Sequence, residues 1–151
     1  MPYVRRTGST FIEICSSIKD VVAVGDASGN TTLNSIVVPN YQGSLSRATL
    51  EMQVMQLTNE NAAVNYLDAE SFIQLQDASS TWRTGISIPT SQCWIDGSAK
   101  SYGSFLFSGA GDLKAYIQPN TTYAIRWYQH NAHLASINFY NVVVKMKLYF
   151  N

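Results

Sequence analysis

Residues 141–151 read NVVVKMKLYFN, and their side chains alternate in character with a period of two. The even-numbered positions from Val142 to Phe150 are all apolar, whereas two lysines and two asparagines stand among the odd-numbered positions of the stretch. Successive side chains of a β-strand point to opposite faces. The stretch therefore predicts a half-buried strand with a strongly specified register.

The same alternation recurs earlier in the chain. It predicts that Tyr123, Ile125 and Trp127 face inward along another strand. It recurs again in residues 48–54 and shifts by one position after Val54, which predicts a β-bulge or an unusually buried strand end.

Further short strands are predicted between clusters of Gly, Pro, Asn, Asp and Ser, which are typical of turns. They are Thr10–Ile18, Leu33–Val38, Ser71–Gln76, Trp82–Ile88, Ser101–Phe107, Leu113–Ile117 and Ala135–Tyr140. The segment Asn61–Glu70 is either a helical turn or an irregular strand. Many short strands without a βαβ rhythm predict an all-β fold: an antiparallel two-sheet β-sandwich of about eight to ten strands. We expect one domain over residues 1–151, with residues 1–9 as an extended N-terminal arm.

Charged residues make up 13% of the chain, about half the usual share, and the formal net charge is zero. Ser, Thr, Asn and Gln together account for 47 of the 151 residues, so neutral polar side chains must cover most of the surface. A surface without net charge gives weak repulsion between copies and favours association. This composition is typical of a protein that works in an assembly, such as a homo-oligomer.

Several partners and locations are disfavoured by the sequence. Arg5 and Arg6 are the only adjacent basic residues, so a nucleic-acid partner is not expected. No window approaches the roughly 18 apolar residues of a membrane span, so no membrane contact is expected. The N-terminal stretch MPYVRRTGSTFIEIC has no apolar core of a signal peptide, so no signal peptide is expected.

No arrangement of residues that would support catalysis emerges, and we expect no enzyme activity, no cofactor and no metal. The sequence has no G-x-S-x-G motif, no phosphate-binding glycine loop and no complete calcium loop. Cys15 and Cys93 fit no metal spacing. Their apolar neighbours predict two buried free thiols, with a disulfide as the alternative.

The remaining candidates for a ligand-binding site are aromatic and basic residues. His130 and His133 form H-x-x-H after a strand, which favours a polar hairpin tip over a zinc site or a protonation-sensitive interface contact. Outward aromatic residues indicate either sugar stacking or subunit packing. The candidate ligand-binding residues are Trp82, Arg83, Arg126, Tyr128, His130 and His133.

The last quarter of the chain, LKAYIQPNTTYAIRWYQHNAHLASINFYNVVVKMKLYF, resembles the final strands of jelly-roll modules. The resemblance rests on Thr121, Tyr123, Ile125 and Trp127 after a Pro/Asn turn, followed by a long alternating strand. It implies a jelly-roll-like architecture and not a particular activity. Proteins of this architecture include virion capsid, decoration and fibre components, and also carbohydrate-binding modules.

Two functions follow as hypotheses. The first is a non-enzymatic structural protein of a virion, which acts through protein–protein contacts. The second is a carbohydrate-binding β-sandwich module with a glycan partner and an extracellular location.

Overall fold

The structure is a computed structural model that describes residues 10–24, 29–59, 70–88, 101–102, 105–109, 111–129 and 137–151. Four subjects of prediction lie outside the described residues: the arm at residues 1–9, Cys93, His130 and His133. The segment that was open between helical turn and strand lies there too, except for its last residue.

Eleven strand segments and one short 3-10 helix make up the described secondary structure. They are β1 (Thr10–Cys15), β2 (Lys19–Val24), β3 (Gly29–Val38), β4 (Leu45–Val54), β5 (Gln56–Asn59), β6 (Ser71–Gln76), β7 (Trp82–Ile88), β8 (Ser101–Tyr102), β9 (Phe105–Ser108), η1 (Lys114–Tyr116), β10 (Thr121–Gln129) and β11 (Ile137–Phe150).

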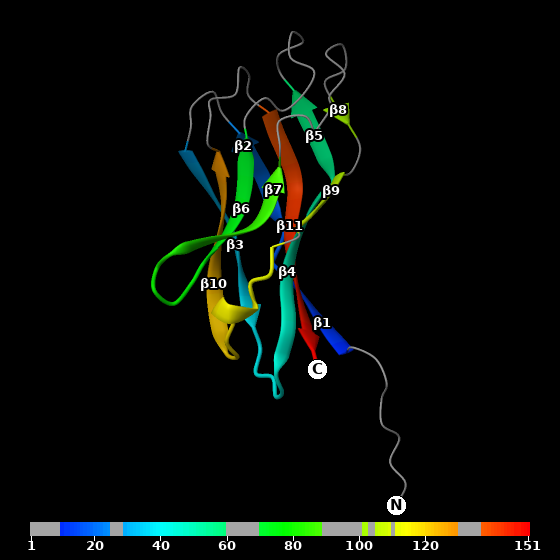
Figure 1. Cartoon of the computed structure of the whole chain (residues 1–151). Helices are drawn as coiled ribbons and strands as arrows, with labels where there is room; N and C mark the ends of the chain where they lie inside the picture. Colours follow the sequence, from blue (N-terminus) through cyan, green and yellow to red (C-terminus); the bar gives the residue numbers. More distant parts are fainter. Residues whose placement is uncertain are drawn as a thin grey trace, which may run out of the picture.

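Antiparallel strand pairs are nested along the chain. β1 and β2 pair with β11, β3 pairs with β10, β4 pairs with β9, β5 pairs with β8, and β6 pairs with β7 (Figure 1). The first strands thus pair with the last strand, and the nesting continues inward to the β6–β7 hairpin. An antiparallel ribbon rolled in this way into two facing sheets is a jelly roll. The predicted fold class is therefore confirmed.

Two more pairings complete the sheets: β11 with β4 and β5, and β10 with β6. The result is a seven-stranded sheet and a four-stranded sheet of order β3-β10-β6-β7. β1 and β2 share one edge of β11, β4 and β5 share the other edge, and β8 and β9 lie beyond them. The described segments therefore fill eight strand positions, four in each sheet.

The regular strand pairing of the larger sheet is broken at the same height in three neighbouring strands. Met55 separates β4 from β5, and its backbone N–H donates to the carbonyl of Tyr140 at 3.1 Å. Next to Tyr140, Asn141 has a φ of 52°, a left-handed conformation that Asn tolerates better than most residues. On the other side of β11, residues 16–18 separate β1 from β2. The shift in alternation after Val54 coincides with this interruption.

The hydrophobic core lies between the two sheets. Tyr123, Ile125 and Trp127 are at most 3% exposed, as their alternation predicts. The even-numbered residues of 142–148 are equally buried and face them from β11. The ring centroids of Trp127 and Phe139 lie 4.8 Å apart, so aromatic packing joins β10 of one sheet to β11 of the other.

The strand predicted at Leu113–Ile117 is wrong, because the chain forms the 3-10 helix η1 there. The carboxylate of Asp112 accepts hydrogen bonds from the backbone N–H groups of Ala48 and Lys114, each at 3.0 Å, and holds this turn against β4. Both ends of the predicted segment are buried. A spacing of four residues places side chains together on a strand and also on a helical turn, so the pattern did not separate the two.

Four further predictions need correction. The strand predicted at Ser101–Phe107 is two strands, β8 and β9, and the last two predicted strands are one continuous strand, β11. The predicted strand Thr10–Ile18 ends at Cys15, and β2 was not predicted. The thiol of Cys15 is exposed rather than buried, because Cys15 lies opposite Lys145 while its neighbour Ile14 packs against the core.

Candidate functional site

The outward surface of the four-stranded sheet brings together residues from three strands. Arg126 of β10 lies opposite Gln74 of β6, which lies opposite Thr84 of β7. Along the same strands, Tyr128 lies opposite Phe72. These side chains alternate with buried ones, so they point away from the core. With Trp82 they form what we call the aromatic–arginine face: Phe72, Gln74, Trp82, Thr84, Arg126 and Tyr128.

Arg126 is the centre of the aromatic–arginine face. Its guanidinium carbon lies 4.2 Å from the ring centroid of Trp82 and 5.2 Å from that of Tyr128. Its Nε donates to Oε1 of Gln74 at 2.8 Å, and Nε2 of Gln74 donates to Oγ1 of Thr84 at 3.1 Å. Cation–π contacts and a hydrogen bond thus fix the plane of the guanidinium group.

A second aromatic contact extends the face along the strands. The rings of Phe72 and Tyr128 stack with centroids 6.1 Å apart and an interplanar angle of 24°. Both side chains are half-buried. Aromatic surface and amide and hydroxyl groups therefore lie side by side on one sheet.

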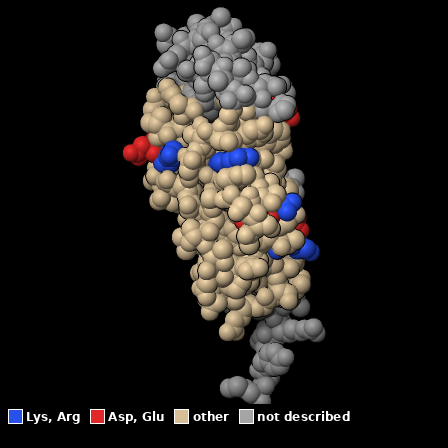
Figure 2. Space-filling model, turned by 90° about the vertical axis from the view of Figure 1, so that its left-hand side faces the viewer, with Lys and Arg blue, Asp and Glu red and all other residues tan. Residues whose placement is uncertain are grey.

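Among the described residues, no carboxylate forms an ion pair with Arg126. Burial lowers the pKa of Arg126, and Tyr128 partly offsets this effect. An arginine stays protonated in proteins even so. The side of the molecule that faces the viewer in Figure 2 shows few charged groups, and they are scattered.

Arg83 is separated from this face although it follows Trp82 directly. Consecutive strand residues point to opposite sides, and Nε of Arg83 forms an ion pair with Oδ2 of Asp77 at 2.8 Å. Its guanidinium group also lies over the ring of Tyr116, 4.3 Å from the centroid. The hydrogen bond from Arg83 lowers the pKa of Asp77, and backbone N–H groups of the β6–β7 turn support the same carboxylate. Arg83 therefore fastens the β6–β7 hairpin and does not join the aromatic–arginine face.

The sequence predicted Trp82, Arg126 and Tyr128 as candidate ligand-binding residues. In the structure, Arg126 contacts the rings of both Trp82 and Tyr128. Sequence reasoning missed Phe72 and Gln74, which lie between them on β6. The alternation of SFIQLQ marks both as outward residues. Their register against β10 depends on strands about 50 residues apart, so the sequence contained no signal for the cluster. The two histidine candidates lie outside the described residues.

A second surface lies on the larger sheet. We call residues 10–24 the β1–β2 edge, because these two strands form one margin of that sheet. The edge exposes large apolar side chains: Phe11, Ile12, Ile18 and Val21. Phe11 also contacts the ring of Tyr149 on β11, with centroids 5.7 Å apart.

Ion pairs lie next to this edge on the outward surface of the same sheet. Lys145 pairs with Glu13 at 3.4 Å, and Lys147 pairs with Glu51 at 2.9 Å. The hydrogen bond from Lys147 to Glu51 raises the pKa of that lysine. These four charges are thus neutralised in pairs.

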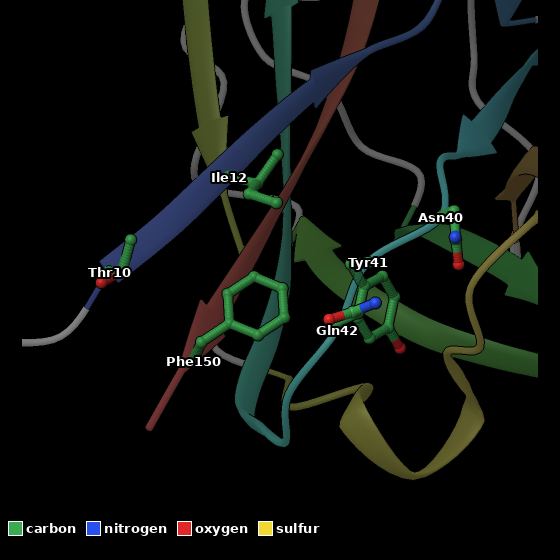
Figure 3. Close-up of a pocket in the computed structure, with 6 residues that line it drawn as sticks. All are labelled: Thr10, Ile12, Asn40, Tyr41, Gln42 and Phe150. Atoms are coloured by element: carbon green, nitrogen blue, oxygen red, sulfur yellow. The ribbon is translucent and has the colours of Figure 1, made fainter.

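A cavity of about 370 Å³ opens at the end of the sandwich where β1 begins and β11 ends. Figure 3 shows Ile12 on one side, with Tyr41 and Phe150 close together on the other. The rings of Tyr41 and Phe150 meet edge to face at 5.3 Å. Burial is the larger cause that raises the pKa of Tyr41, and the nearby Tyr123 raises it further. The cavity is mixed in character, because Thr10, Asn40 and Gln42 also line it.

Two kinds of feature are absent from the described residues. No group of three or more His, Cys, Asp or Glu side chains in that part of the chain is placed to hold a metal ion. No helix in the described ranges has the length and apolar character needed to cross a membrane.

Comparison with known proteins gives likeness of fold only. Neither a protein-family model nor a curated protein matches the chain. Among solved structures, the xylan-binding module CBM15 is similar over 91% of this chain and 97% of the module, at 12% identity and a TM-score of 0.49.

Virus proteins are similar at the same level. The capsid of cyanophage Pam1 contains a chain that matches 100% of this chain over 92% of its own length, at 13% identity and a TM-score of 0.41. A structure of infectious bursal disease virus, Gx strain, matches 99% of this chain over 41% of its own, at 10% identity and a TM-score of 0.45. These likenesses do not choose between a binding module and a capsid protein.

Proposed function

We propose that this protein is a non-enzymatic structural component of a virion that assembles with further copies of itself. The observation that carries the proposal is the β1–β2 edge. It holds four of the seven large apolar side chains that are exposed in the described part of the chain. Ile18 and Val21 are 60% and 46% exposed on this edge.

An apolar sheet margin is unfavourable for an isolated molecule. Within the described strands, β1 and β2 pair on one side only, with β11. Exposed edges of this kind are templates for pairing with another chain unless charges, prolines or bulges protect them. A second copy offers the same edge, so a twofold axis would bury both edges against each other.

Composition and fold support the virion context. The chain has ten acidic and ten basic residues, and charged residues are only 13% of the total, which favours association over mutual repulsion. Jelly rolls are a recurrent architecture of viral capsid proteins and of lectins. The fold thus allows both proposed functions, and the exposed edge favours assembly.

Light scattering coupled to size-exclusion chromatography tests assembly. We expect an oligomer of fixed stoichiometry for the wild type and a shift toward monomer for the double variant Ile18→Ser/Val21→Ser. Leu106→Ser is the matched control, because Leu106 is 59% exposed on β9, away from this edge. A wild type that stays monomeric at high micromolar concentration would contradict assembly. Failure to find the chain in purified virus particles by mass spectrometry would contradict the virion context.

The aromatic–arginine face favours a second function, carbohydrate binding. Sugars bind to proteins through stacking on aromatic rings and hydrogen bonds from planar polar groups. Trp82 and Tyr128 supply the rings, and Gln74 and Arg126 supply the planar groups on one sheet. This arrangement supports binding on the surface of the sheet rather than in a deep pocket.

A glycan array followed by titration tests this second function. Trp82→Ala is expected to abolish the binding of any glycan found. Tyr149→Ala is the control, because it removes an aromatic ring from the other sheet. Carbohydrate binding is rejected if no glycan binds, or if Trp82→Ala binds as the wild type does.

A further inference from the structure

Arg126 differs in its partners from three other half-buried basic residues of the described structure. Arg83, Lys145 and Lys147 each have a carboxylate oxygen within 3.4 Å. Arg126 has two aromatic rings and one amide instead, and no acidic side chain of the described residues pairs with it. A partly buried cation without a counterion is a site where an external anion gains a charge-assisted hydrogen bond.

The terminal N–H groups of Arg126 are available to donate hydrogen bonds to a ligand. Its Nε is used by Gln74, whereas its terminal N–H groups have no hydrogen-bond acceptor among the described residues. These terminal groups match the two oxygens of a carboxylate. The rings of Trp82 and Tyr128 and the amide of Gln74 already restrict the guanidinium plane. A ligand therefore meets a preorganised group and loses less conformational entropy on binding.

The surroundings of Arg126 favour a sugar over an acidic peptide. Thr32 lies opposite Arg126 on β3, and Asn30 lies opposite Tyr128. Thr84 continues the row on the far side of Gln74. These neutral groups suit hydroxyl groups, whereas recognition of an acidic peptide relies on several clustered cations.

We propose that the aromatic–arginine face binds a carboxylate-bearing sugar, such as a uronic or sialic acid residue. The carboxylate accepts hydrogen bonds from the terminal N–H groups of Arg126, and the sugar ring lies against the neighbouring aromatic surface. This inference rests on carbohydrate binding, the second function proposed above, and names the chemical class of its ligand.

Isothermal titration calorimetry with matched ligands tests the inference. The ligands are trigalacturonic acid and its methyl ester, 3′-sialyllactose and lactose, and sodium acetate. At least one acidic sugar is expected to bind roughly tenfold to a hundredfold more tightly than its neutral counterpart, as expected for charge-assisted hydrogen bonds. Acetate alone, which cannot stack, is expected to bind far more weakly.

Variants of the full chain assign the effect to Arg126. Arg126→Gln is expected to remove the preference for the acid, and Arg126→Lys to restore only part of it, because an ammonium group lacks the two-pronged geometry. Arg47→Gln is the control, because Arg47 is an exposed arginine on β4 of the other sheet. Circular dichroism and a thermal melt confirm that each variant is folded.

The outcomes separate this inference from the function on which it rests. Loss of acid preference in Arg126→Gln but not in Arg47→Gln supports it. Equal binding of acid and neutral sugars, lost in Trp82→Ala, preserves carbohydrate binding and overturns the role of the carboxylate. Acid preference that survives Arg126→Gln also overturns it. Binding of no sugar, or of acetate as tightly as of the sugars, overturns carbohydrate binding and this inference together.

Discussion

The hydroxyl group of Tyr123 ties the start of β10 to the turn before it, and we expect Tyr123→Phe to destabilise the protein. The hydroxyl oxygen accepts a hydrogen bond from the backbone N–H of Gln118 at 2.7 Å and donates to the carbonyl of Tyr116 at 3.0 Å. The tyrosine side chain is 3% exposed. Phenylalanine fills the same space, so the substitution removes two hydrogen bonds and leaves the packing unchanged.

The size of the effect follows from those two bonds. Each intramolecular hydrogen bond contributes a net of about 1 kcal/mol, and a buried group left without a partner costs about 1–3 kcal/mol. Gln118 is exposed, so water replaces part of the loss. We therefore expect the free energy of unfolding to fall by about 1–3 kcal/mol. At roughly 2–4 °C per kcal/mol for a domain of this size, the melting temperature falls by about 2–12 °C.

Urea unfolding monitored by tryptophan fluorescence measures the free energy, and calorimetry measures the melting temperature. Tyr149→Phe is the matched control, because Tyr149 is half-buried on the outward surface of β11 and its hydroxyl forms no hydrogen bond within the described residues. The control is expected to change stability by less than about 0.5 kcal/mol. Equal stability of Tyr123→Phe and the wild type would refute the reasoning that this hydroxyl group fastens the turn.

Three further predictions concern other parts of the fold. Gly109→Ala places a methyl group against the carbonyl oxygen of Gly85, which is backbone and cannot turn aside, so urea unfolding should show a loss of about 1–3 kcal/mol; unchanged stability would contradict this close approach. Arg83 holds the pKa of Asp77 below its ordinary value, so the carboxylate stabilises the fold above the unfolded-state pKa and that contribution is lost as the pH falls through the folded-state pKa. Melting curves between pH 3 and 7 should therefore show a weaker pH dependence for Asp77→Asn, and curves parallel to the wild type would count against this ion pair. The exposed thiol of Cys15 should react with Ellman's reagent without denaturant, and a Cys15→Ser variant that keeps the same fast reaction would show that the reactive thiol is another one.

The sequence predicted the fold best where one face of a strand is buried. β6 and β7 match their predicted bounds, and β10 and β11 bury the predicted faces, because alternation reports burial on a single side. It failed at the turn after Asp112, where a helical turn and a strand bury the same two positions. It also missed β2, whose run KDVVAV has Lys19 and Asp20 at its start and the exposed Val21 beside the buried Val22.

The candidate site was predictable only in part. Trp82, Arg126 and Tyr128 are recognisable as outward groups on their own strands. Their meeting depends on the pairing of β10 with β6 and of β6 with β7, including a register shift between Ile73 and Gln74. Sequence patterns carry no information on such pairing between distant segments. For the same reason, only the structure shows that Arg83 lies on the opposite side of the sheet from Trp82.

The nested pairing of the strands has a consequence for how the chain reaches its folded state. Thr10 pairs with Phe150, so the partner of β1 is made about 140 residues later. A ribosome adds roughly 5–20 residues per second, so this strand emerges roughly 7 to 28 seconds before its partner exists. β11 is the common neighbour of β1, β2, β4 and β5, and pairings between such distant segments form slowly. Val22 of β2 is fully buried in the folded protein and lies opposite Phe139 of β11, so it stays uncovered during synthesis until β11 is made, and a chaperone that binds nascent chains would reach it first.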